Sequence, residues 1–303
     1  MAAPMRSTDF RSIVEPILNE CFDGVYDLRE DEWSRVFREQ EGIPRNYHEE
    51  PVLYGFGAAP QLPDGTPVSY QQGGVLFLQR YVYNVYGLAF ALTKVLVEDG
   101  DHIRIGQVYA KHLAQSLIET KETLSANVLN RAFNSSYPGG DGVSLLNSAH
   151  PLVNGGTNAN TPTTAADLNE TSLENAVIQI AAWTDERGLL IAARPKKLIV
   201  PPALMFVATR LLETELRVGT NNNDINAIKN NGAVPEGYTV NHFLTATNAW
   251  FLTTDVPNGL KHFERTPLAN SMDGDFDTGN VRYKSRERYS FGWSDPLGIY
   301  GSY

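Results

Sequence analysis

The sequence predicts a mixed α+β protein organised around one long helix, and three stretches support this. A helical pattern without proline runs from about residue 103 to residue 133. Residues 280–293 alternate strictly, which is typical of a strand with one buried face. Proline and glycine punctuate short extended runs between residues 50 and 78, which indicates a narrow two-stranded excursion. The chain therefore combines a rod, strands and a slender projection.

Residues 1–49 are expected to form an arm that obtains part of its core from another subunit. The segment begins with apolar residues at helical spacing, and Pro16 is expected to break or kink this helix. Many charges follow over residues 27–41, with few apolar side chains among them. These are Leu28, Trp33, Val36 and Phe37. A segment with so little apolar surface is not expected to fold alone. The alternative is that this N-terminal segment is only loosely docked.

The excursion at residues 50–78 is too narrow to enclose a core. Pro63-Asp64-Gly65 predicts a turn near its tip, since glycine tolerates a positive φ. Isolated hairpins are marginally stable in water, so we expect this one to lie on another surface. A flexible surface loop is the alternative.

The next stretch leads into the long helix. Its sequence, QRYVYNVYGLAFALTKVLVEDG, predicts a strand followed by another strand or a short helix. The helix after it places one apolar face at helical spacing: Ala110, Leu113, Ala114, Leu117, Leu124, Val128 and Ala132. Residues 119–123 are polar on every face for more than one turn. One flank of the helix must there be solvated or meet a polar partner.

A helix–strand–helix unit follows the long helix. Residues 138–170 form a long loop rich in Gly, Asn, Thr and Pro. Residues 171–174 fit a capping box, which predicts a helix that stops at Gly188. Residues 197–200 predict a strand, and Pro201-Pro202 opens a second helix.

The last fifty residues predict strands. Two strands, 249–254 and 260–265, flank a turn at residues 256–259. In residues 280–293 the aromatic and basic side chains point to opposite faces. The basic ones are Arg282, Lys284, Arg286 and Arg288. Three interpretations of this basic stripe are open. It is a solvated face, it pairs with an acidic arm of a neighbouring subunit such as residues 30–32, or it contacts DNA phosphate.

Composition excludes several classes of protein. The 303 residues are 42% hydrophobic and 20% charged, typical of a folded protein, and the net charge of −10 argues against a non-specific nucleic-acid binder. Cys21 is the only cysteine, so an intrachain disulfide is impossible and a reducing compartment is expected. The first residues lack a signal-peptide pattern, and no apolar run is long enough to predict a membrane span.

The sequence contains no catalytic, cofactor or metal constellation above background. His150 is the best general-base candidate, with Asp185 as a conceivable partner, but no nucleophile motif accompanies it. Dinucleotide, P-loop and HExxH motifs are absent. Asp273, Asp275 and Asp277 resemble the start of a calcium loop, but the glycine and glutamate that should follow are missing. We therefore predict no catalytic residue, cofactor or metal.

Several stretches resemble the major capsid proteins of tailed bacteriophages with the Hong Kong 97-type fold, and most closely the Mu-type major head subunit group. The similarity extends over roughly residues 75–300. The stretches that carry it are QRYVYNVYGLAFALTKVLVEDG, LAQSLIETKETLSANVLNRAF, LLNSAHPL, TDERGLLIAARPKKLIVPPALMFVATRLLETE and DPLGIYGS. These are family-wide patterns rather than an active-site signature.

The resemblance implies an α+β fold with four parts. They are an N-terminal arm at 1–49, an E-loop at 50–78, a peripheral domain at 79–138 and 251–303 that carries the long "spine helix", and an axial domain at 139–250. It implies a non-enzymatic shell protein that assembles as pentamers and hexamers around the double-stranded DNA of a tailed phage. An encapsulin-like nanocompartment shell and a soluble hydrolase are the alternatives.

The resemblance also implies partners and sites. We expect homo-oligomeric capsomers in a virion, made in the bacterial cytoplasm, with a separate scaffolding protein, a portal protein, a decoration protein in some cases, and only loose contact with DNA. Neither a membrane nor a crosslink between subunits is expected. Candidate interface residues are Trp33, Phe37, Tyr54, Phe56, Tyr70 and the basic stripe. The spine helix is expected to flex at Glu119, Thr120, Lys121, Glu122 and Thr123.

Overall fold

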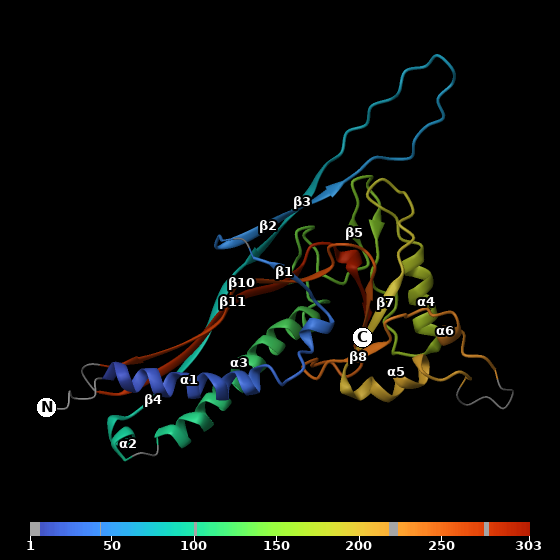
Figure 1. Ribbon diagram of the computed structural model, residues 1–303. Helices are drawn as coiled ribbons and strands as arrows, with labels where there is room; N and C mark the ends of the chain where they lie inside the picture. Colours follow the sequence, from blue (N-terminus) through green and yellow to red (C-terminus); the bar gives the residue numbers. More distant parts are fainter. Residues whose placement is uncertain (1–6, 43, 100–101, 218–223, 276–278) are drawn as a thin grey trace.

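The computed structural model describes residues 7–42, 44–99, 102–217, 224–275 and 279–303. Figure 1 shows an elongated molecule: long strands and long helices form one end, shorter helices gather at the other, and a hairpin projects away from both. The helices are α1 (Ser7–Tyr26), η1 (Trp33–Arg35), α2 (Lys94–Glu98), α3 (His102–Asn130), α4 (Glu170–Ala181), η2 (Pro202–Leu204), α5 (Met205–Leu212), α6 (Ala227–Asn230) and η3 (Pro296–Gly298). The strands are β1 (Arg38–Glu41), β2 (Tyr47–Tyr54), β3 (Gly74–Val82), β4 (Asn84–Leu92), β5 (His150–Pro151), β6 (Thr157–Asn158), β7 (Pro195–Val200), β8 (Tyr238–Val240), β9 (Trp250–Thr254), β10 (Leu260–Gly274), β11 (Val281–Trp293) and β12 (Ile299–Ser302).

The first sheet has the strand order β1-β10-β11-β4. Strands β10 and β11 form a long antiparallel ribbon, β4 pairs antiparallel with β11, and β1 pairs parallel with β10. The alternation predicted for β11 is confirmed, because its basic residues are largely exposed while Tyr283 and Tyr289 on the opposite face are buried. Helices α1 and α3 cover that buried face.

The arm packs on its own subunit, which corrects the expectation that it borrows a core from a neighbour. Helix α1 contributes buried Leu18 and Phe22 to a cluster with α3 and β11. It also continues through Pro16, where we expected a break or kink. Trp33 and Phe37 are buried in a second cluster inside the same chain. Few apolar residues suffice because α3 and the sheet supply the rest of the surface.

The spine helix is confirmed as α3, a single α-helix of 29 residues. Its N-terminal half buries the predicted apolar face, including Leu113 and Leu117. In its C-terminal half the buried face differs from the prediction: Ala126 and Leu129 are buried, while Leu124 is only half-buried. The polar middle lies between these two apolar faces.

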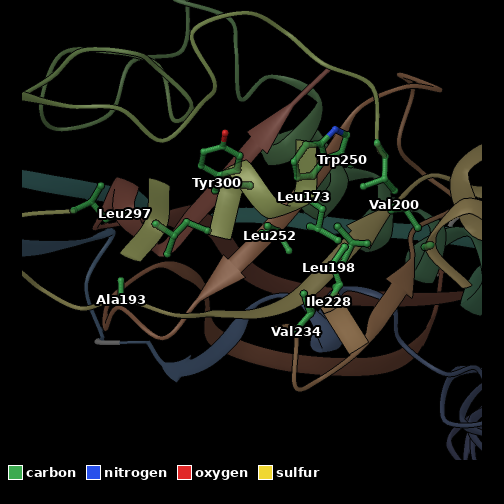
Figure 2. Packing of buried hydrophobic residues seen from close by; sticks show 14 of the residues in the cluster. Leu173, Ala193, Leu198, Val200, Ile228, Val234, Trp250, Leu252, Leu297 and Tyr300 are labelled. Carbon is green, nitrogen blue, oxygen red and sulfur yellow. The ribbon is translucent and has the colours of Figure 1, made fainter. Parts of the chain in front are cut away.

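The second sheet has the order β12-β9-β7-β8, and an apolar core lies between it and helices α4 to α6. Figure 2 shows Leu198, Leu252, Trp250 and Tyr300 of these strands gathered around Leu173 of α4. This region corresponds to the axial domain of the prediction. Strands β9 and β12 belong to it by pairing, although both fall almost wholly within the segment that we assigned to the peripheral domain.

The turn at residues 256–259 is present, but its flanking strands do not pair, because β9 lies in the second sheet and β10 in the first. The chain thus crosses from the second sheet to the first at residues 256–259. It crosses back to the second sheet at residues 294–298, where the Asp295 amide donates to the Asn258 carbonyl at 2.7 Å. Asn258 has φ +65°. A Cβ on Gly298 would lie 2.2 Å from the Gly259 Cα, so the two crossings touch and both glycines are required.

The N-terminal cap of α4 also differs from the prediction. Asn169 is the cap and exchanges hydrogen bonds with Ser172, so the box lies two residues before the predicted one. The helix ends at Ala181, and Gly188, with φ +85°, occupies a separate turn. Asn is at least as good a cap as Thr, and its neighbour Glu170 is favourable in the first turn.

Candidate subunit-contact surfaces and the polar centre of the spine helix

Two charged residues in the middle of the spine helix are buried. Glu122 is 1% exposed and Lys121 is 7% exposed, whereas Glu119 and Thr123 are exposed. We expected this stretch to be solvated on one flank or to meet a polar partner. The structure shows both, because some of its side chains are exposed and others are buried against polar groups. Because burying a charge without a partner is costly, the contacts of these two side chains position the helix.

Glu122 holds the arm. One carboxylate oxygen accepts from the Glu32 amide at 2.8 Å and the other from the Trp33 amide at 3.1 Å, so the side chain satisfies the first amides of η1. Burial and the nearby carboxylates of Glu32 and Asp31 raise the pKa of Glu122 to about 7, although the two amides oppose this. Near neutral pH the group is therefore close to half ionised.

Lys121 faces the first sheet. Its Nζ lies 3.6 Å from Glu287 and 4.0 Å from Glu264, and it sits over the Trp33 and Tyr289 rings at 4.8 and 5.2 Å. Burial raises the pKa of Glu287, and the ammonium of Lys121 opposes that rise. One cation thus binds the helix to both central strands and to the arm.

His262 completes this cluster without a hydrogen bond. It is fully buried, and neither ring nitrogen has a partner in the described part of the chain. Its ring lies 4.3 Å from that of Trp33 and 4.6 Å from that of Phe291. Burial, followed by the charge of Lys121, lowers the pKa of His262 to about 3, so the ring is neutral and acts as a packing group.

Sequence reasoning found Lys121 and Glu122 but missed their partners. The signal was present in β11, where Ser285 and Glu287 interrupt an otherwise aromatic face. A carboxylate in the middle of a buried strand face requires a cation from the element packed above it. Nothing comparable marks Glu264 or His262 in the sequence.

The aromatic interface candidates fall into two groups. Trp33 and Phe37 are buried inside the subunit, in edge contact with Phe291, and are therefore no longer candidates for a contact between subunits. Phe56 and Tyr70 lie in the projecting loop and are 60% and 99% exposed. Tyr54, at the end of β2, is half-buried and stacks under the guanidinium of Arg187.

The basic stripe lies on the face of the first sheet opposite α1 and α3. Its neighbours in register on β4 are small, from Ala91 beside Arg282 to Gly87 beside Arg286. Arg282 pairs with Asp275, and Arg288 donates to the Tyr83 carbonyl. Lys284 and Arg286 are the exposed members in the middle of the stripe.

The acidic arm residues that we considered as partners for this stripe bind within their own subunit instead. Glu30 pairs with Arg35, and Glu32 accepts from the amide and Nδ1 of His242, the latter at 2.6 Å.

His150 is a structural residue of the long loop. Its Nδ1 lies 2.6 Å from Asp141 and its Nε2 lies 3.1 Å from Asn160, so both nitrogens are engaged. The proposed pairing with Asp185 is wrong, since Asp185 accepts from the amides of Arg187 and Leu189 in its own turn. This removes the dyad on which the hydrolase alternative depended.

Metal sites and membrane spans are both absent from the residues that the structure describes. Within them, His, Cys, Asp and Glu nowhere gather as a group that could hold a metal ion. Asp277, the last acid of the calcium-like pattern, lies outside the described residues. No helix in the described part of the chain is both long and apolar enough to cross a membrane.

Comparison with solved structures shows the same fold. The chain superposes on the virus-like particle from Pyrococcus furiosus with a TM-score of 0.55 and 12% identity, over 95% of this chain and 98% of that one. Against the mature capsid of bacteriophage PhiM1 the values are 0.54 and 12%, over 90% and 87%. Against Mycobacterium phage Che8 they are 0.53 and 12%, over 90% of each chain. No curated protein sequence matches.

A family comparison completes the identification. The family described as phage capsid protein matches residues 83–302, from the residue after β3 to the end of β12. This match covers well over half of the chain and includes β4, β10 and β11 of the first sheet, the spine helix and the whole second sheet with its core. The chain therefore belongs to the phage capsid protein family, with the Hong Kong 97-type fold and the structural role of a major capsid protein.

Proposed function

We propose that this protein is the shell subunit of an icosahedral head and that it assembles as pentamers and hexamers that enclose the double-stranded DNA of a tailed phage. The observation that carries the proposal is the β2–β3 hairpin, which projects from the body in Figure 1. Its strands and tip expose large apolar side chains: Leu53, Phe56, Leu62, Val68, Tyr70, Val75 and Leu78. A projection of this kind gains stability when a second subunit covers it.

The hairpin is anchored at its base and open at its tip. Glu50 of β2 binds Lys261 of β10 through both oxygens, at 2.8 and 2.6 Å, and also accepts from Ser294. Burial opposes ionisation of Glu50, but the bonds from Lys261 and Ser294 lower its pKa below the usual value. The base therefore sets the direction of the projection while the tip remains available to a neighbour. Head-to-tail contacts of this kind close into rings.

Family membership places the protein in the virion as part of a shell of many subunits. We further propose synthesis in the bacterial cytoplasm, a separate scaffolding protein, a portal protein, a decoration protein in some shells, and only loose contact with packaged DNA. We also propose the Mu-type group, which the stretches quoted from the sequence support. The four-part division remains our proposal, with β9 and β12 assigned to the axial domain by their pairing.

Bending of the spine helix at residues 119–123 is also a proposal. Lys121 and Glu122 support it, because at one point of the helix Lys121 binds the sheet and Glu122 binds the arm. A change in shell state that moves the arm relative to the sheet would act on these two adjacent residues. Two states of the shell with an identical helix at this point would refute it.

Electron microscopy of the expressed protein tests the shell proposal. Residues 58–70 can be replaced by a two-residue turn, since the Gly57 amide already donates to the Gln71 side chain at 2.8 Å across the base of the tip. We expect shells or capsomers from the wild-type chain and from the control Asp64→Asn, and folded but unassembled subunits from the deletion.

Two results would count against the proposal. Wild-type protein that remains a compact monomer near 33.5 kDa would contradict assembly into a shell. Shells in which mass spectrometry finds an enclosed enzyme in place of DNA would identify an encapsulin-like nanocompartment.

A further inference from the structure

A polar cavity of about 300 Å³ lies where the arm, β7 and the start of β10 meet. Its lining includes five cationic side chains and a single carboxylate, Glu236. The cations are Arg35, Arg38, Lys196, Lys197 and Lys261. In a chain with net charge −10, this concentration of positive charge is unusual.

The backbone brings these cations together in two ways. The register of β7 with β9 shifts between Pro195 and Lys197, and such a bulge breaks the alternation that sends consecutive side chains to opposite faces. Lys196 and Lys197 thus both line the cavity. Strand β1 pairs in parallel with β10, which sets Arg38 directly beside Lys261.

Three carboxylates neutralise part of this charge. Lys261 binds Glu50, Lys197 lies 3.2 Å from Glu236, and Arg35 pairs with Glu30. The last pair is exposed on both sides, so it contributes little and can be exchanged for another anion.

The remaining two cations, Arg38 and Lys196, form no ion pair in the described part of the chain. Neighbouring like charges repel one another, and a bound anion would remove that repulsion. The cavity therefore has an excess of positive charge over its own carboxylates.

We propose that this cavity binds a phosphoryl group, either of a nucleic-acid backbone or of free phosphate. Guanidinium groups bind phosphate oxygens in a planar fork, and ammonium groups act as point charges beside it. Arg35 and Arg38 supply the first kind of donor and Lys196 and Lys197 the second. The excess charge is matched by one dianionic free phosphate or by two adjacent monoanionic phosphates of a nucleic-acid backbone. The site depends on this subunit alone and not on the assembled shell.

The test uses the full-length protein and isothermal titration with inorganic phosphate, pyrophosphate and a twelve-nucleotide single-stranded DNA. The variant Arg38→Gln/Lys196→Gln removes the two unpaired cations. The control Arg45→Gln/Lys111→Gln removes the same charge at exposed positions outside the cavity. We expect at least one probe to bind the wild type and the control equally, and the cavity variant at least tenfold more weakly. Unfolding curves would confirm that each variant is folded.

The pattern of binding identifies the source of the phosphoryl group. Oligonucleotide binding that weakens with salt, with the salt slope reduced by about 0.7 in Arg38→Gln, identifies a nucleic-acid backbone. Binding of phosphate or pyrophosphate alone identifies a free anion. Failure of every probe to bind, or equal weakening in the cavity variant and the control, would overturn the proposal. None of these results depends on shell assembly, so they are distinct from failure of the proposed function.

Discussion

Replacing Glu122 by glutamine should change how the stability of the subunit depends on pH. The carboxyl has a pKa of about 7 in the folded chain and 4.5 as its ordinary value. Each pH unit corresponds to about 1.4 kcal/mol, so ionisation of Glu122 is about 3 kcal/mol less favourable in the folded state than in the unfolded state. The group is almost fully buried, so solvent screening reduces this figure little.

The sign follows from proton binding. Between pH 4.5 and pH 7 the folded state holds a proton on Glu122 that the unfolded state has released. Stability from this group is therefore fully present below pH 4.5 and is lost as pH rises through about 7. Glu122→Gln also costs about 1–3 kcal/mol, because its amide faces a backbone N–H, but that cost does not vary with pH.

Urea unfolding of unassembled subunits at several pH values from 4.5 to 8.5 measures the effect. Subtracting the Glu122→Gln curve from the wild-type curve isolates the residue. We expect this difference to change by about 2–3 kcal/mol across the range. Glu119→Gln, one turn away on the exposed face of the same helix, is the matched control and should give a flat difference. A flat difference for Glu122 as well would refute the reasoning.

Three other outcomes are expected. Lys121→Met should lower the free energy of unfolding by about 3–5 kcal/mol by leaving Glu287 buried and unpaired, and Lys121→Met/Glu287→Gln should recover much of it in urea unfolding. Trp33→Ala should cost about 3–5 kcal/mol in the same assay if the arm is part of its own subunit's core; a loss below about 1 kcal/mol would restore the hypothesis of a borrowed core. Tyr70→Ser should leave unfolding unchanged within about 0.5 kcal/mol yet slow assembly followed by light scattering, since the ring is 99% exposed; unchanged assembly would remove it from the interface.

Much of the layout could be predicted from periodicity. The spine helix, the alternation of β11 and the turn at Pro63-Asp64-Gly65 each follow from local rules, and Gly65 indeed has φ +81°. The prediction of a polar partner for residues 119–123 was also local, because a fully polar turn within an otherwise apolar helix must either face water or meet polar groups.

The errors concern contacts distant in sequence. Burial of Trp33 depends on α3 and β11, which lie far along the chain. The composition of the arm alone therefore suggested that the arm has no core within its own subunit. The separation of β9 and β10 into different sheets depends on pairing with β7 and β11, and a turn signal between two strands cannot reveal this. His150 has Asp141 as its partner because the loop folds back, whereas sequence offered no means of choosing among the carboxylates.

The paired glycines at 259 and 298 have a mechanical consequence. They bring two chain crossings into backbone contact at one place between the sheets. Each sheet keeps its own hydrogen-bond ladder on either side of that place. Beside this contact the two sheets share one apolar cluster, to which Ile199, Phe251 and Leu260 contribute, so a side chain at either glycine would push the two connections apart and disturb that shared packing.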